Sequence, residues 1–219
     1  MKIAILGATG YVGSHLVQEG LTRGHQVTGL SRHPDKLPDH PGLRKVALDL
    51  LADPALAGRT LSGHDVILYA YNPARQSQAP DIYEQHLRGH QALLAAMAHC
   101  NVKRLLCVGG AASLKIASGE EFLDSEQFPP QYADFKPSIR GTRALYYLLK
   151  EHPELDWVFL APSAVLIDGQ RTGQYRTGTD YLLYDQAGMS TISLQDYAVA
   201  MLDEAEQPRH HKERCTVGY

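Results

Sequence analysis

The stretch GATGYVG at residues 7–13 decides how the rest of the chain is interpreted. It follows directly on the apolar run Lys2–Leu6, which has the length and composition of a buried strand. The residues after it have helical spacing, and we expect a helix from near Tyr11 to Gly24. A glycine-rich turn between a first strand and a first helix is the context that indicates dinucleotide binding rather than a purely structural turn.

Each of the three glycines has a physical role in such a turn. Gly7 allows the tight turn after the strand, Gly10 lets backbone amides approach a phosphate, and Gly13 lets the helix lie close to the sheet. The start of the helix would then face the phosphates with free N–H groups and the positive end of its dipole. The spacing here is GxxGxxG rather than GxGxxG, so the prediction rests on the setting as much as on the motif.

Short apolar runs alternate with helical patterns along most of the chain, which is typical of βαβ units. We expect a single NAD(P)-binding α/β domain over residues 1–219, with a Rossmann-like, doubly wound parallel sheet and helices on both faces. The further predicted strands are Gln26–Leu30, Arg44–Ala47, Val66–Tyr71, Arg104–Val108 and Trp157–Ala161, and the further helices are Pro80–His99 and Ser138–Glu151.

The sequence pattern changes after the predicted strand Trp157–Ala161. Alternation in Asp180–Tyr184 suggests short strands, and Ser193 begins a capping box for a helix that ends before Pro208. A final strand is expected at Arg214–Val217. We expect residues 162–219 to form a small cap over the strand ends, where open α/β sheets bind ligands.

Composition excludes several classes of protein. A formal net charge of −3 and a charged share of 21% give no reason to expect nucleic acid or an anionic membrane surface as a partner. Three dispersed cysteines indicate neither a disulfide framework nor a metal cluster, and Cys100 and Cys107 are expected in the core. We therefore expect a cytoplasmic protein that binds a small molecule in a pocket and has no membrane span.

The end of the second predicted strand indicates which dinucleotide binds. An acidic residue there would hold the ribose hydroxyl of NAD, whereas a basic one suits the 2′-phosphate of NADP. The sequence has Ser31 and Arg32 at this point, and no carboxylate before Asp35. A guanidinium and a hydroxyl can both bind the phosphate, so we expect NADP(H) in preference to NAD(H). The alternative is that Arg32 is a solvated loop residue.

Several motifs together resemble the atypical short-chain dehydrogenase/reductase superfamily. Within it, the chain is similar to the small NAD(P)H-binding proteins named NADH-flavin reductases, to biliverdin-IXβ reductase and to nitrogen-metabolite-repression regulators, and it is also related to the epimerase/dehydratase branch. The residues that carry the resemblance are GATGYVGSHL at 7–16, LDL at 48–50, GHDVI at 63–67, VGGA at 108–111, LDW at 155–157 and RTGQYR at 171–176.

The resemblance implies a role for each matching position. The pyrophosphate would lie against the glycine-rich turn, the adenine and ribose at the ends of the next strands, and the nicotinamide and its carboxamide at the ends of the last two. In that order the residues are Gly7, Thr9, Gly10, Tyr11 and Val12; Asp49 and Leu50 for adenine; Ala70 and Tyr71 for ribose; Val108, Gly109 and Gly110 for nicotinamide; and Ala161, Pro162 and Ser163 for carboxamide.

A Tyr-x-x-x-Lys pair, the usual proton donor of this superfamily, is present at Tyr132 and Lys136, with Ser113 upstream as a candidate for polarising a carbonyl. Pro137 disfavours helical dihedrals at Lys136 and suits the first position of a helix, so Tyr132 would lie in a loop and would not share a helical face with the lysine. Both interpretations stay open. Without a working pair, the substrate would be a flavin, a quinone or a similar planar ring that accepts hydride.

The resemblance implies an oxidoreductase that reduces a planar acceptor by hydride transfer. The alternatives are a non-catalytic NADP(H)-binding regulator or redox sensor, and a sugar-nucleotide epimerase or dehydratase, for which the cap leaves little surface. No metal is expected. His86 and His90 share one helical face, but no third ligand accompanies them, and we expect both to be solvated.

Overall fold

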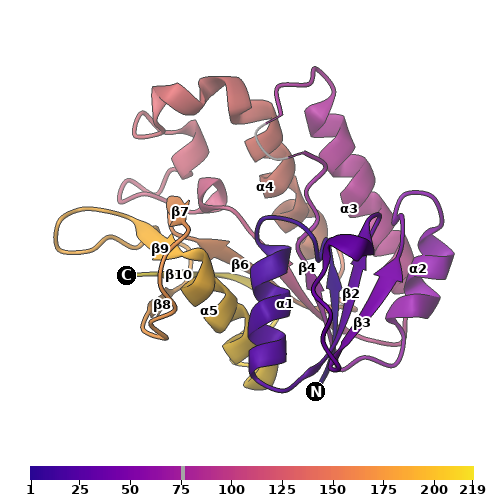
Figure 1. The fold of residues 1–219 in the computed structure, drawn as a ribbon. Helices are drawn as coiled ribbons and strands as arrows, with labels where there is room; N and C mark the ends of the chain where they lie inside the picture. The colour runs from indigo at the N-terminus through magenta and orange to yellow at the C-terminus, as the bar shows by residue number, and fades with distance from the viewer. Residues whose placement is uncertain (75–76) are drawn as a thin grey trace.

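The computed structural model describes residues 1–74 and 77–219 of the chain. Helices and strands alternate through most of it (Figure 1). The elements are β1 (Lys2–Leu6), α1 (Gly13–Thr22), β2 (Gln26–Ser31), β3 (Leu43–Ala47), α2 (Pro54–Leu61), β4 (Val66–Tyr69), α3 (Ile82–Ala98), β5 (Arg104–Val108), α4 (Lys136–Lys150), β6 (Asp156–Pro162), β7 (Val165–Ile167), β8 (Arg176–Gly178), β9 (Thr191–Ser193), α5 (Leu194–Glu206) and β10 (Glu213–Gly218).

The main sheet confirms the predicted fold class. Its strand order is β3-β2-β1-β4-β5-β6-β10-β8, and every pairing is parallel except that of β8 with β10. The order reverses between β1 and β4, the switch point at which doubly wound sheets bind ligands. A second, small sheet pairs β7 with β9 beyond the end of β6.

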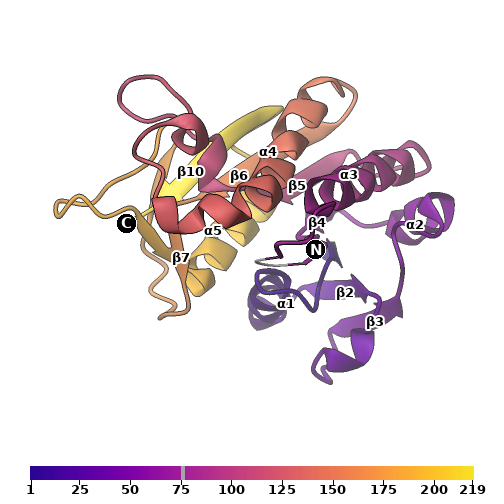
Figure 2. The ribbon, with the colours of Figure 1, turned by 90° about the horizontal axis from the view of Figure 1, so that it is seen from above.

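Helices cover both faces of the main sheet. Helices α1 and α5 pack together on one face, and α2, α3 and α4 lie on the other, as the view from above shows (Figure 2). Each face has its own hydrophobic core. Cys107 lies in the first core and Cys215 in the second, and both are fully buried. This layering leaves the carboxyl ends of β1 to β6 at one edge of the sheet.

The turn between β1 and α1 requires glycine at two positions. Gly7 has a φ of +80°, and a Cβ there would lie 2.6 Å from the carbonyl oxygen of Ala70. A Cβ on Gly13 would lie only 2.1 Å from the carbonyl oxygen of Gly7. The backbone of the turn thus packs directly on the first turn of α1 and on the end of β4, with no space for a side chain between them.

The C-terminal quarter of the chain supplies α5, β8 and β10 to the main layers, and β7 and β9 to the small second sheet. The Ser193 hydroxyl accepts a hydrogen bond from the Asp196 amide, which confirms the predicted cap of α5. The buried Asp196 carboxylate then accepts from the Thr172 amide and hydroxyl, the Gly173 amide and the Tyr219 hydroxyl. One aspartate therefore fixes the loop before β8 to the start of α5 and to the end of the chain.

One sequence-based expectation about elements is wrong, and one helix was missed. The segment Asp180–Tyr184 forms no strand; instead the Leu182 amide donates to the carbonyl oxygen of Lys115, in a loop contact that alternation alone cannot distinguish from a ladder. Helix α2 was not expected, although Asp53 caps it by accepting from the Leu56 amide and Pro54 stands at its first position. Its eight residues are too few for a clear apolar periodicity.

Candidate functional site

A cavity of about 800 Å³ opens at the carboxyl ends of the parallel strands. Most of the site residues expected from the sequence line it. These are Gly7, Thr9, Gly10, Tyr11, Val12, Ser31, Arg32, Asp49, Leu50, Ala70, Tyr71, Val108, Gly109, Gly110 and Tyr132. The switch point between β1 and β4 lies in the middle of this set, so the glycine-rich turn borders the centre of the cavity.

The glycine-rich turn brings the start of α1 to the cavity wall. No side chain caps this helix, and the first turn contains no acidic residue. The start of α1 therefore presents its positive dipole end with no acidic side chain in its own first turn to offset it. This arrangement fits a phosphate group of a dinucleotide.

One end of the cavity, beyond β2, carries polar and cationic groups and is called the adenosine end below. The Ser31 hydroxyl is buried and has no hydrogen-bond partner among the described residues, so it is available to a ligand after a change of rotamer. Arg32, Lys36 and Arg88 line the same end. Burial raises the pKa of Tyr71, and nearby Arg32 partly offsets that effect.

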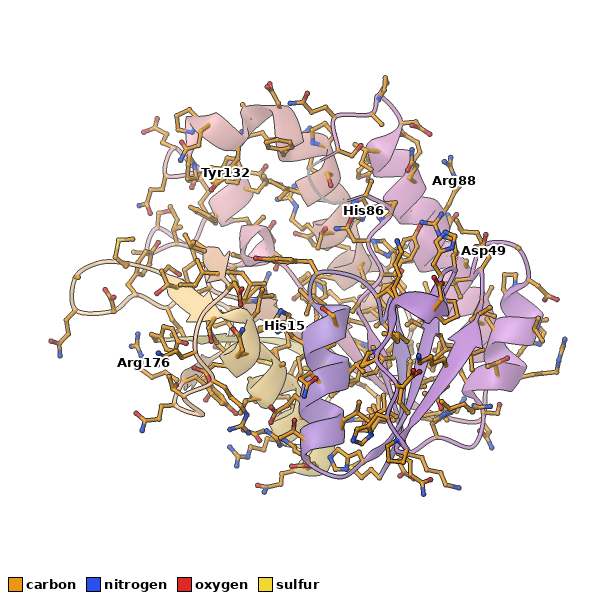
Figure 3. The ribbon with its side chains drawn as sticks, viewed as in Figure 1. His15, Asp49, His86, Arg88, Tyr132 and Arg176 are labelled. Atoms are coloured by element: carbon orange, nitrogen blue, oxygen red, sulfur yellow. The ribbon has the colours of Figure 1, made fainter. Side chains whose placement is uncertain are left out.

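The opposite end, which we call the aromatic end, lies beyond β5 and under the start of α4. It is lined by Phe122, Phe128, Tyr132 and Ile139, together with Arg143. Phe122 and Phe128 make an edge-to-face contact with ring centroids 5.6 Å apart. Figure 3 shows Asp49 and Arg88 on one side of the molecule and Tyr132 across from them. A planar apolar ring could pack against this aromatic wall.

The candidate proton-donor residues are not gathered in the cavity. Tyr132 lies in a short 3-10 helix over Pro130–Phe135, not in a loop, and is 42% exposed. Lys136 has helical dihedrals and begins α4, so the expectation that Pro137 would keep it out of the helical region is wrong. The Lys136 ammonium lies 5.1 Å from the ring centre of Phe128, and Lys136 is not among the residues that line the cavity. Ser113 is fully buried, and its hydroxyl donates to the Gly110 carbonyl oxygen.

The residues expected at the carboxamide end lie just outside the cavity. Ala161 and Ser163 are buried, and the Ser163 hydroxyl donates to the carbonyl oxygen of Val217 on β10. Neither they nor Pro162 line the cavity; the next residues, 164–166, do. The shift arises because β6 continues to Pro162 before the chain leaves the sheet.

The histidine pair on α3 is buried, so the expectation that both are solvated is wrong. His86 and His90 are 1% and 2% exposed and face Gly141 on α4, which has no side chain to displace them. His90 Nε2 lies 3.0 Å from the Gly141 carbonyl oxygen, and Nδ1 lies 3.1 Å from the Tyr69 hydroxyl. Burial lowers the pKa of each imidazole to about 4. The described residues form no cluster of three or more metal-binding side chains.

Several residues of the cavity were not anticipated from the sequence. Arg88 and Arg143 come from α3 and α4, which pack against each other, whereas Phe128 comes from the loop before α4 and Lys36 from the short 3-10 helix after β2. Motifs mark strand ends, but they do not predict which face of a distant helix covers those ends. A basic residue four positions after Arg32 was the one available signal, and it points to Lys36.

The fold and the turn together define a dinucleotide-binding protein with a Rossmann-like sheet. Comparison with known proteins identifies the family: residues 7–208 match the NAD(P)H-binding family, and the chain belongs to it. The uncharacterized protein YwnB of Bacillus subtilis is 33% identical over 99% of this chain and 98% of its own length.

Solved structures similar to the chain carry differing provisional names. A Bacteroides thetaiotaomicron protein with the provisional name epimerase is 37% identical, with a TM-score of 0.89 over 100% of this chain and 96% of its own. A Streptococcus pneumoniae protein with the provisional name NADH-flavin reductase is 29% identical, with a TM-score of 0.85 over 100% and 99% of the two chains. A Burkholderia pseudomallei protein with the provisional name exported protein is 38% identical, with a TM-score of 0.86 over the full length of both chains.

These likenesses support an oxidoreductase-like protein that binds NAD(P)H, and they name no common substrate. They also leave the cytoplasmic location as a prediction, because one similar structure is named as exported. Within residues 1–74 and 77–219, none of the helices combines the length and the apolar composition that a membrane crossing requires.

Proposed function

We propose that the chain is an NADPH-dependent reductase of a small planar acceptor, such as a flavin or a quinone. The observation that carries this proposal is the continuity of the cavity, which joins the glycine-rich turn to the aromatic end. NADPH supplies the hydride when it is bound, so the protein has to bind and orient both partners and exclude water between them. The wall of Phe122, Phe128 and Tyr132 supplies the surface for a flat acceptor.

The residues that would hold the dinucleotide follow from their places along the cavity. The residues of the 7–12 turn would bind the pyrophosphate, and Ser31 and Arg32 the 2′-phosphate of the adenosine ribose. Gly109 and Gly110 would border the nicotinamide, since small residues at a strand end leave space for a flat ring. The cations Arg32, Lys36 and Arg88 support NADPH in preference to NADH.

We expect Arg32→Ala to raise the Kd for NADPH roughly 10- to 100-fold, because a hydrogen bond to a charged group contributes about 1.5–3 kcal/mol. The Kd for NADH, which lacks the phosphate, should change little. The matched control is Arg59→Ala, which removes another exposed arginine, on α2 and outside the cavity. Equal losses for both nucleotides would contradict the assignment; fluorescence titration of each nucleotide measures the effect.

The proposed reduction does not require a side chain that donates a proton. Because Lys136 does not line the cavity, we expect Lys136→Met to change kcat by less than about threefold, whereas loss of a general acid typically costs roughly 10²- to 10⁴-fold. Tyr132→Phe should behave similarly, with water supplying the proton to the acceptor. A loss of about 100-fold in both variants would instead identify the pair as the proton donor.

The proposal is tested by following NADPH absorbance while riboflavin, quinones and dichlorophenol dyes are added in turn. Oxidation of NADPH that depends on both protein and acceptor is the expected result. Tight binding of either NADP⁺ or NADPH, measured separately, with no turnover of any acceptor would favour the alternative role of redox sensor. The buried Ser113 hydroxyl, which is engaged by Gly110, gives little support to an epimerase or dehydratase.

A further inference from the structure

Charge is distributed unevenly along the cavity. The adenosine end carries three cations, Arg32, Lys36 and Arg88, and one carboxylate, Asp49. Arg88 pairs with Asp81 at 3.3 Å, whereas among the described residues Arg32 and Lys36 form no ion pair. At the aromatic end, Arg143 is the one charged residue among the described lining side chains. An anionic group on an acceptor would therefore have to be accommodated by Arg143.

Arg143 is already compensated by two carboxylates. Its Nη1 donates to Glu121 Oε2 at 2.7 Å and to Asp124 Oδ2 at 2.5 Å, and the guanidinium side chain is only 15% exposed. Burial lowers the pKa of Arg143, but the hydrogen bond and charge of Asp124, together with the charge of Glu121, outweigh that effect and raise it. The two carboxylates therefore stabilise the guanidinium charge and offset it toward other anions. The next cation, Arg214, is buried and paired with Asp180 at 2.6 Å.

The carboxylate of Glu121 is itself held in place. Its Oε1 accepts a hydrogen bond from the Tyr147 hydroxyl at 2.5 Å, and Arg214 Nη1 lies 3.9 Å from the same atom. Tyr147 and Arg143 lie one turn apart on α4, so Glu121 connects this helix to the segment that carries Phe122. The two carboxylates do not line the cavity themselves, so the negative charge is fixed directly behind Arg143.

We propose, on the basis of the proposed function, that the acceptor is an uncharged planar ring system, and that Glu121 and Asp124 are the residues that select against anionic ring substituents. A sulfonate, carboxylate or phosphate in the cavity near Arg143 would approach a guanidinium whose charge Glu121 and Asp124 already offset, in a partly dehydrated site. An uncharged ring meets only the apolar wall. In each turnover NADPH, the quinone and one proton give NADP⁺ and the hydroquinone.

The test compares two acceptors that differ by a charge on the ring: ortho-naphthoquinone and ortho-naphthoquinone sulfonate. Their ratio of kcat/KM is measured in the wild-type protein and in the double variant Glu121→Gln/Asp124→Asn. The amides keep oxygen atoms that can accept from Arg143 but remove both negative charges. Because the intrinsic reactivity of each quinone cancels in this comparison, only the change in selectivity is measured.

We expect the double variant to favour the sulfonate by about tenfold more than the wild type does, a change equivalent to about 1.4 kcal/mol. The single variant Asp124→Asn, at a half-exposed position, should give a smaller shift in the same direction. It provides the test if the double variant does not fold. Glu120→Gln, at the adjacent exposed glutamate, is the matched control and should leave the ratio unchanged.

Three outcomes separate the two proposals. Turnover of both quinones with a ratio that does not change in either variant would overturn the selection by Glu121 and Asp124 and leave the reductase intact. A double variant that favours the sulfonate less than the wild type does would overturn it as well. No oxidation of NADPH with either quinone, or with the flavins and dyes, would contradict the proposed function itself.

Discussion

A Gly13→Ala variant is expected to lose at least about 90% of the affinity for NADPH and to be destabilised by about 1–3 kcal/mol, the usual cost of overpacking. The added methyl group would lie 2.1 Å from the Gly7 carbonyl oxygen, and that atom belongs to backbone that cannot rotate away. Either α1 or the turn has to move, and both border the phosphate part of the cavity. Isothermal titration with NADPH and urea unfolding measure the two effects.

The matched control is Gly20→Ala on the same helix. A Cβ there would meet only the side chain of Val27, at 3.0 Å, and alanine has the higher helix propensity. We expect this variant to bind NADPH with unchanged affinity. Normal binding by Gly13→Ala would show that the turn does not hold the dinucleotide as proposed.

The stability of the protein is expected to fall steeply as the pH drops from about 6.5 towards 4. His86 and His90 are buried in their neutral forms, with the pKa of each lowered to about 4, whereas in the unfolded chain each binds a proton near its ordinary value. Protonation therefore favours the unfolded state within this window, and the contribution is fully present only above it. At about 1.36 kcal/mol for each pKa unit, one such histidine contributes roughly 3 kcal/mol.

Urea unfolding at a series of pH values measures this effect, and His86→Gln and His90→Gln separate it from the general effect of carboxylate protonation. Each variant should be less stable at pH 7 but lose less stability on acidification than the wild type does. His99→Gln, at an exposed position just after α3, is the control and should follow the wild-type pH dependence. Parallel curves for all four proteins would contradict the neutral, buried state of the pair.

The sequence is sufficient to predict a doubly wound, mainly parallel sheet and the edge of the sheet at which the cavity opens. The GATGYVG turn and the short apolar runs are local signals, and parallel strands joined by helices bring their carboxyl ends to one edge. Val108–Gly110 and Ser31 line the cavity for this reason. The same argument fails at Ala161–Ser163, because it cannot tell how far β6 continues before the chain turns.

The residues at the aromatic end of the cavity cannot be predicted from such local sequence signals. Arg143 reaches the cavity from α4, which packs on α3 at Gly141, where the missing side chain leaves space for the two histidines. Phe128 reaches it from the loop that precedes α4. Neither the histidines' burial nor the pairing of Arg143 with Asp124 has a signature in residue spacing. The residues that we propose select the acceptor therefore emerge only from the tertiary structure.

A structure of the complex with NADP⁺ and ortho-naphthoquinone tests the central claim most directly. The account predicts the adenosine ribose beside Arg32, the nicotinamide beside Gly109, and the quinone between the nicotinamide and Phe128. A nucleotide bound elsewhere, or a nicotinamide whose free face is covered by protein so that no acceptor can reach it, would contradict the account.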